Sequence, residues 1–156
     1  MGLTVLYLNA RSVKAFIASD GNPLCKICRL TILQQLVFCC WHDVAPICET
    51  WLKDKVLPSE LLPGYNIYHK DRSRRVRGRV LIAVKHDIQS NHCFDLGKNQ
   101  IEMVTVELLK ISCKPVILYT FYHAAPALDD LNLLNISCSG RWLSSVSRGA
   151  MVGFLG

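Results

Sequence analysis

Short apolar runs separated by polar turn clusters divide the chain, and most of them are typical of strands. Leu3–Leu8 ends at Asn9, and its Val and Tyr residues favour a strand. Asp43–Cys48 predicts a second buried strand that ends at Glu49, and Pro46 within it indicates an edge strand or a bulge. Further strands are predicted at Tyr65–His69, Arg79–Lys85, Ile101–Leu109 and Val116–Tyr122, the first two pairing as a hairpin.

Helix-like patterns lie mainly between the first two predicted strands. Ala10–Ala18 and Leu24–Phe38 are compatible with helices, and the breaker cluster Asp20-Gly-Asn-Pro23 separates them. Ala127–Ile136 fits a short helix that begins after Pro126. Beyond Ser137 the apolar residues follow neither a helical nor a strand periodicity. Short strands with two or three helices predict layered α/β (α+β) packing, as in half of a larger sandwich.

The bulk composition indicates a folded protein without a membrane segment. Of the 156 residues, 51% are hydrophobic and 19% are charged, which is a globular rather than a disordered balance. No uninterrupted apolar run is long enough to cross a membrane, and the N-terminus carries no basic region of a secretory signal. We therefore expect an intracellular protein, nuclear or cytoplasmic, that is not secreted and has no membrane partner.

Positive charge is concentrated in one segment, residues 70–85. The net charge is +6, and this segment holds Lys70, Arg72, Arg74, Arg75, Arg77, Arg79 and Lys85 against Asp71 alone. Such a stripe can neutralise phosphates and would make binding salt-dependent. The alternative is a solvated turn that has no partner.

The eight cysteines allow two interpretations. Without a secretory signal, disulfides are not expected, and most of the thiols are interpreted as buried or incidental. Cys25, Cys28, Cys39 and His42 imitate a zinc site, although adjacent Cys39 and Cys40 seldom face one tetrahedral ion together. A zinc-stabilised interaction domain therefore stays open as one alternative.

Three polar residues stand where predicted strands end: Asn9, Glu49 and Tyr122. If those strands are neighbours, an amide, a carboxylate and a phenol meet at one rim. A single carboxylate can hold a Mg²⁺ ion that keeps most of its waters. Such an ion polarises a phosphoryl oxygen, so the set suits phosphodiester chemistry.

Four motifs in order carry a family resemblance over residues 3–136. They are Leu6-Tyr-Leu-Asn-Ala-Arg-Ser-Val13, Ile47-Cys-Glu-Thr-Trp-Leu-Lys53, Leu62-Pro-Gly-Tyr-Asn-Ile-Tyr-His-Lys-Asp-Arg-Ser-Arg-Arg75 and Val80-Leu-Ile-Ala-Val-Lys85. The chain resembles the endonuclease/exonuclease/phosphatase superfamily, and in particular the apurinic-like endonuclease domain of non-LTR (LINE-type) retrotransposons. The resemblance implies a partial four-layer α/β sandwich of the DNase I-like type, mainly its N-terminal sheet and covering helices. Residues 1–136 would form the N-terminal part of that domain, and residues 137–156 a degenerate tail.

The resemblance also implies roles for single residues. Glu49 would bind Mg²⁺, Asn9 would contact the scissile phosphate or orient catalytic groups, and Tyr122 would contact a phosphate of a DNA substrate. No small-molecule cofactor is implied. The family's Tyr-Arg-Pro-Pro segment reads Tyr122-His-Ala-Ala-Pro126 here, and Val76-Arg-Gly-Arg79 departs from its glycine-rich turn.

Other family motifs do not occur in the chain. Met151-Val-Gly-Phe-Leu-Gly156 stands where the family has Gly-Asp-Phe-Asn, and no Ser-Asp-His motif is present. We therefore expect a truncated, catalytically incomplete endonuclease domain. The alternative is a non-catalytic nucleic-acid-binding module that uses the basic hairpin of residues 70–85.

Overall fold

The computed structural model describes residues 3–19, 22–52, 57–70, 80–93, 102–109, 115–122, 145–147 and 150–155, which form two packed sheets, a separate hairpin and two helices. The four-stranded sheet has the order β1 (Leu8–Asn9), β4 (Val44–Cys48), β6 (Leu81–Lys85), β5 (Tyr65–His69). The five-stranded sheet has the order β10 (Ser145–Ser147), β11 (Ala150–Leu155), β9 (Val116–Tyr122), β8 (Glu102–Leu108), β7 (Ser90–His92). The hairpin pairs β2 (Phe16–Ser19) with β3 (Asn22–Cys28), and the helices are α1 (Arg29–Cys39) and α2 (Pro58–Leu61).

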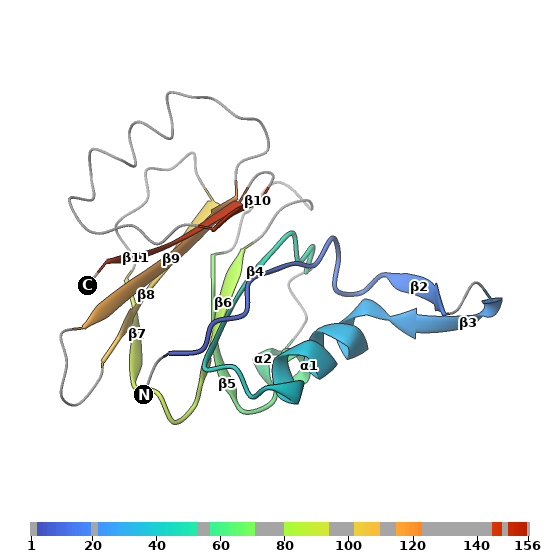
Figure 1. Ribbon diagram of the computed structural model, residues 1–156, viewed down its shortest axis with the longest axis horizontal. Coiled ribbons are helices and arrows are strands. Elements are labelled where there is room, and N and C mark those ends of the chain that lie inside the picture. Colours follow the sequence, from blue (N-terminus) through green and yellow to red (C-terminus); the bar gives the residue numbers. More distant parts are fainter. Residues whose placement is uncertain are drawn as a thin grey trace.

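The four-stranded sheet lies in the middle of three layers, as Figure 1 shows. One of its faces packs on the five-stranded sheet through a cluster that includes Val44, Ile82, Val104 and Leu118. The other face packs under the helices through Leu33, Val37, Ala45, Ile47, Leu61, Leu62, Leu81 and Ala83. Successive residues of a strand point to opposite faces, so both faces of β4 and β6 are apolar and both strands are continuous hydrophobic runs. The α+β class expected from the sequence is confirmed.

The β-strands predicted from apolar runs are largely present. Tyr65–His69 and Val116–Tyr122 have the predicted bounds, and β5 and β6 pair antiparallel as expected. The predicted helix at Ala10–Ala18 is wrong, because Phe16–Ser19 is a strand that pairs with β3. The second predicted helix begins only at Arg29, since the chain up to Cys28 belongs to the same hairpin. The predicted helix at Ala127–Ile136 lies outside the described residues.

Pro46 lies in the centre of the sheet rather than at its edge, since β4 has β1 on one side and β6 on the other. The Val44 and Cys48 carbonyls accept hydrogen bonds from Leu6 and Ala10, so the even-numbered residues of β4 face β1. Alternation turns the Pro46 nitrogen to the same side, where the missing N–H interrupts only the ladder with β1. This explains why that ladder is an isolated Val5–Val44 bridge followed by a two-residue strand.

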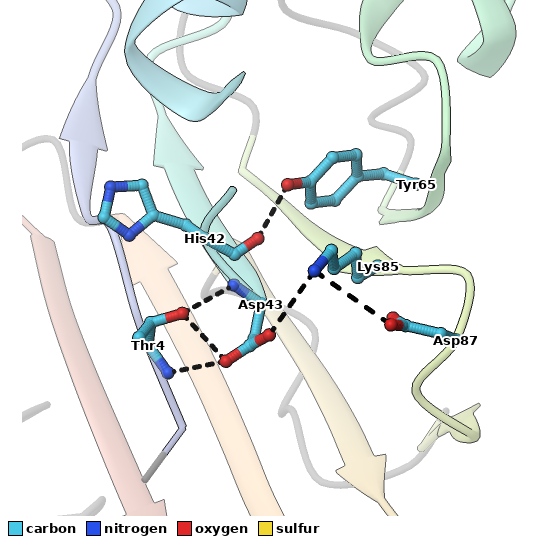
Figure 2. A network of polar contacts seen from close by, with 6 residues as sticks. All are labelled: Thr4, His42, Asp43, Tyr65, Lys85 and Asp87. Atoms are coloured by element: carbon cyan, nitrogen blue, oxygen red, sulfur yellow. Dashed lines mark hydrogen bonds and ion pairs between the residues drawn. The ribbon is translucent and has the colours of Figure 1, made fainter. Parts of the chain in front are cut away.

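A polar network fixes the start of β4 to its neighbours, and Figure 2 shows its members. The Asp43 carboxylate accepts hydrogen bonds from the Thr4 backbone N–H at 2.9 Å and from the Thr4 hydroxyl at 2.8 Å. Lys85 lies 3.9 Å from Asp43 and 4.0 Å from Asp87, and the Tyr65 hydroxyl donates to the His42 carbonyl at 2.6 Å. We call this end of the sheet, where β4 begins and β6 ends, the Asp43 end.

No helix within the described ranges has the length and apolar character needed to span a membrane.

Candidate functional site

The candidate site lies at the opposite end of the four-stranded sheet from Asp43, where β1 and β4 end side by side. The two strands run parallel with Leu8 beside Ile47 and Asn9 beside Cys48. Beyond the strands, the Ser12 N–H donates to the Glu49 carbonyl at 2.8 Å and the Val13 N–H to the Thr50 carbonyl at 3.1 Å. Because the parallel pairing continues into both loops, the residues that follow each strand are held together. We call this end of the sheet, where β1 and β4 end, the Asn9–Glu49 rim.

Asn9 and Glu49 contact each other directly at this rim. The Asn9 Nδ2 donates to the Glu49 Oε1 at 3.4 Å, across a separation of 40 residues in the sequence. The Asn9 Oδ1 accepts a hydrogen bond from the Arg11 backbone N–H at 3.3 Å. Both ends of the amide are therefore engaged, and this network fixes which way the amide faces. Glu49 keeps further lone pairs for another ligand.

The backbone around the pair adopts left-handed conformations without glycine. Arg11, Ser12, Glu49 and Trp51 have φ values of 41°, 76°, 52° and 48°, and they are four of the five non-glycine residues with positive φ in the described ranges. Each such residue costs on the order of 1 kcal/mol, so tertiary contacts must hold the loops in this shape. Concentrated backbone strain of this kind is a feature of binding and catalytic sites.

A pocket of about 290 Å³ opens beside Asn9, between β1, the hairpin and α1. Its walls combine apolar side chains with two arginines, Arg11 and Arg29, and the lining comprises Leu8, Asn9, Ala10, Arg11, Ile17, Arg29, Ile32, Leu33 and Leu36. The Arg29 guanidinium donates to the carbonyls of Ala10 and Arg11, which ties the first turn of α1 to the loop after Asn9. The pocket can thus take an apolar group next to the candidate site.

Tyr122 is the last residue of β9, and the structure describes its backbone only. β9 approaches the end of β4, where the Cys48 Sγ lies 3.6 Å from the Thr120 Oγ1. β9, which ends at Tyr122, therefore lies against the end of β4, which Glu49 follows. The neighbouring His123 lies outside the described residues.

The described ends of the predicted basic stripe, Lys70 and Lys85, lie at opposite ends of the sheet strands. Ile47 pairs with Leu81, and Leu81 pairs with His69, so Lys70 and Val80, which flank residues 71–79, both lie at the Asn9–Glu49 rim. The predicted phosphate-binding residues Arg72, Arg74, Arg75, Arg77 and Arg79 lie outside the described part of the chain. Lys85, the last residue of the stripe, lies at the opposite end of β6, about 17 Å along the strand from Val80, paired with Asp43 and over the Trp41 ring at 5.9 Å.

The zinc interpretation does not fit the fold. Cys28 precedes α1 and Cys39 ends it, so an 11-residue helix of about 16 Å separates the two thiols. One zinc ion bonds each sulfur at about 2.3 Å, and these cysteines therefore cannot share it. Throughout the described ranges, no three His, Cys, Asp or Glu side chains converge as metal ligands. A metal at the rim would have Glu49 as its carboxylate and would complete its shell with waters, an arrangement that Mg²⁺ tolerates.

No model of a known protein family matches the chain, and no curated protein matches it.

Proposed function

We propose that this chain belongs to the endonuclease/exonuclease/phosphatase superfamily and descends from the endonuclease domain of a LINE-type retrotransposon. The observation that supports this most is the contact between Asn9 and Glu49. Two motifs 40 residues apart each contribute one polar residue, and the two side chains lie within 3.4 Å at a strained rim. Neither residue has an apparent packing role, because both stand at strand ends and are only half-buried.

The layering supports the finer fold assignment, a partial sandwich of the DNase I-like type. Two sheets pack face to face, and α1 and α2 cover the outer face of the four-stranded sheet. Such a sandwich places the ends of central strands at one edge, where a substrate can reach them. In this proposal the N-terminal sheet and its helices are the part of the domain that the motifs define.

The roles at the rim follow from the chemistry of the side chains. The Glu49 carboxylate would bind Mg²⁺ through an oxygen, and Asn9 would hold that carboxylate in place through its Nδ2 while facing the phosphate. The bound ion would supply Lewis-acid polarisation of a phosphoryl oxygen. Tyr122 would contact the phosphate, and the arginines of the 71–79 turn would grip the DNA backbone.

We expect little cleavage from these 156 residues, because they contain neither the Gly-Asp-Phe-Asn nor the Ser-Asp-His motif. A missing general base and a missing second carboxylate each lower such rates by orders of magnitude. Metal binding is therefore a sharper test than turnover. Mn²⁺ can be titrated into the protein and followed by the loss of its free-ion electron paramagnetic resonance signal.

The expected result is one weak Mn²⁺ site that Glu49→Gln abolishes. Glu60→Gln is the matched control, since Glu60 is an exposed carboxylate on α2 away from the rim. Equal binding by wild type and Glu49→Gln would contradict the proposed metal role. Robust Mg²⁺-dependent plasmid nicking that Glu49→Ala abolishes would contradict the expectation of an incomplete site.

A second candidate function is nucleic-acid binding without catalysis through the basic turn. The register of β5, β6 and β4 supports it, because Lys70 and Val80, which flank residues 71–79, both lie at the Asn9–Glu49 rim. A gel shift titrated against salt tests this function. Replacing Arg74 and Arg75 with Gln should lower the slope of log K against log salt by about 2 on duplex DNA. Absence of duplex binding at low salt would exclude it.

A further inference from the structure

The β2–β3 hairpin belongs to neither of the two packed sheets. Its strands pair with each other and with no other strand of the described sheets. Figure 1 shows it extending past the N-terminal end of α1, away from both sheets. A two-stranded ribbon is only marginally stable by itself. Here its base is attached by the Arg29 N–H, which donates to the Ala15 carbonyl at 2.8 Å.

One face of the hairpin carries an exposed aromatic ring beside a lysine. The register places Phe16 opposite Cys28 and Ala18 opposite Lys26. Phe16 and Lys26 are therefore diagonal neighbours on adjacent strands, on the same face of the hairpin. Phe16 is 63% exposed, and Lys26 is exposed one step nearer the tip. Lys14, which is also exposed, precedes Phe16 by two residues toward the base. Lys26 therefore lies beside the ring on one face of the hairpin, and Lys14 lies in the turn that leads into β2.

The charge of this region is one-sided. Residues 1–42 contain four cations, Arg11, Lys14, Lys26 and Arg29, and one acid, Asp20. Within the described residues none of the four forms an ion pair with a carboxylate. The Arg29 guanidinium instead donates to the Ala10 and Arg11 carbonyls, so the basic region is continuous with the loop after Asn9.

We propose that this face of the β2–β3 hairpin binds single-stranded nucleic acid. An unpaired base stacks on the Phe16 ring, and Lys26 beside the ring and Lys14 in the turn before β2 neutralise neighbouring phosphates. Aromatic stacking combined with a positive track is the general means of binding unpaired strands. Duplex bases are already stacked on each other and leave such a ring without a partner, and an acidic peptide would use the lysines but not the ring.

The inference shares with the proposed function only the class of partner. It requires neither a metal ion at Glu49 nor cleavage, and it concerns other residues than the basic segment 71–79. The test uses the whole chain and a fluorescein-labelled 20-nucleotide oligothymidylate, with binding followed by fluorescence anisotropy at low salt in EDTA.

Phe16→Ala should weaken binding by roughly 5- to 150-fold, the range for loss of one stacked base. Phe16→Trp should retain the affinity, whereas Phe16→Leu should behave like Phe16→Ala, because leucine keeps apolar area but has no π-face. Trp41→Ala is the matched control. It removes an aromatic side chain of equal exposure, 62%, from the Asp43 end of the molecule, and it should leave the affinity unchanged. Because Phe16 is exposed, its replacement should leave the thermal melt unchanged.

The lysines are tested through salt dependence. The double variant Lys14→Gln with Lys26→Gln should lower the slope of log K against log salt by about 1.4, at about 0.7 per phosphate contact on a single strand. Failure of wild type to bind the oligonucleotide, full affinity in Phe16→Ala, or full affinity in Phe16→Leu would overturn the proposal. Binding that depends on Arg74 and Arg75 but not on Phe16, Lys14 or Lys26 would overturn it as well. That last result would leave the proposed function of the rim intact.

Discussion

Thr4 donates both its backbone N–H and its hydroxyl to the Asp43 carboxylate, at 2.9 and 2.8 Å. This contact joins the segment before β1 to the start of β4, and the contact of Asn9 with Glu49 joins the two strands at their other end. A slip of one residue between the strands would turn Asn9 to the opposite face of the sheet. The Thr4–Asp43 contact therefore sets the register on which the candidate site depends.

Asp43→Ala is expected to lower the free energy of unfolding by about 1–3 kcal/mol, since it removes charge-assisted hydrogen bonds from Thr4. Urea denaturation measures this. Asp87→Ala is the control, because Asp87 is 71% exposed and has one contact with Lys85 at 4.0 Å; its replacement should change stability by under about 0.5 kcal/mol. Equal stability of the two variants would contradict a role for Asp43 in fixing the register.

The same carboxylate should contribute to acid sensitivity. Burial raises the pKa of Asp43, but the Thr4 hydrogen bonds and the Lys85 and His42 charges outweigh burial and hold it below its ordinary 3.8. The folded state therefore binds the proton more weakly than the unfolded state does. The stabilisation is present above pH 3.8 and is lost as the pH falls through the folded-state pKa. Stability measured against pH should show a shallower acid decline in Asp43→Ala than in wild type.

His92 should make stability depend on pH in a second, higher range. Burial lowers its pKa below the ordinary 6.5, and the charges of His69 and Lys70 lower it further. Protonation is therefore easier in the unfolded chain, so the stabilisation is complete above pH 6.5 and declines as the pH falls below it. His92→Gln should flatten the stability curve between about pH 7 and 5. His86→Gln, at an exposed position in the turn after β6, is the matched control and should keep the wild-type slope.

The central sheets could be predicted from the sequence because each of their long strands has at least one apolar face. β4, β5, β8 and β9 all follow from uninterrupted or alternating apolar runs, with bounds within one or two residues. The hairpin of β2 and β3 could not be predicted in this way. Ala10–Ala18 has helix-compatible residues, and only the pairing of Phe16 with Cys28 and the Arg29–Ala15 hydrogen bond make that segment extended.

The strands near the C-terminus could not be predicted for a similar reason. Residues 137–156 show no period, yet β11 forms as the neighbour of β9, with Met151 beside Phe121 and Gly153 beside Tyr119. In these pairs the partner lies 30 and 34 residues earlier, which a local pattern does not contain. Pairing of this kind is tertiary context overriding intrinsic preference.

The candidate site was predictable in its residues but not in its geometry. Asn9 and Glu49 stand out because each follows an apolar strand, and parallel strands end at one edge. The left-handed backbone of Arg11, Ser12, Glu49 and Trp51 was not predictable, because none of these is a glycine or an asparagine that would indicate positive φ. Hydrogen bonds between the two loops impose that backbone only after the strands have paired.

Replacing Pro46 tests the account of the interrupted β1–β4 ladder. In Pro46→Val the new backbone N–H should face β1 and donate to the carbonyl of Leu6, which extends the parallel pairing. We expect that amide to be strongly protected in hydrogen exchange. The net change in stability should stay within about 1 kcal/mol, since a gained hydrogen bond offsets the lost rigidity of proline. An unprotected amide at position 46 would contradict the assigned side of the strand.

Asn9→Asp tests the rim as a cation site most directly. The substitution replaces the 3.4 Å hydrogen bond with two carboxylates at the same separation. Without metal, like-charge repulsion should lower stability by on the order of 1 kcal/mol. A divalent cation placed between the carboxylates would remove that repulsion, so Mg²⁺ or Mn²⁺ should raise the melting temperature of Asn9→Asp more than that of wild type. At a metal concentration of 100 times Kd the gain is about 2.7 kcal/mol.

Asn66→Asp is the matched control, because it adds the same charge to a half-buried position of β5 that lies opposite the apolar Val84. Its melting temperature should respond to metal as that of wild type does. In the double variant Asn9→Asp with Glu49→Gln one charge is removed, so both the metal-free destabilisation and the metal response should disappear together. A metal response that persists without Glu49 would place the cation elsewhere, and no response in Asn9→Asp would show that the rim does not bind divalent cations even when a second carboxylate is supplied.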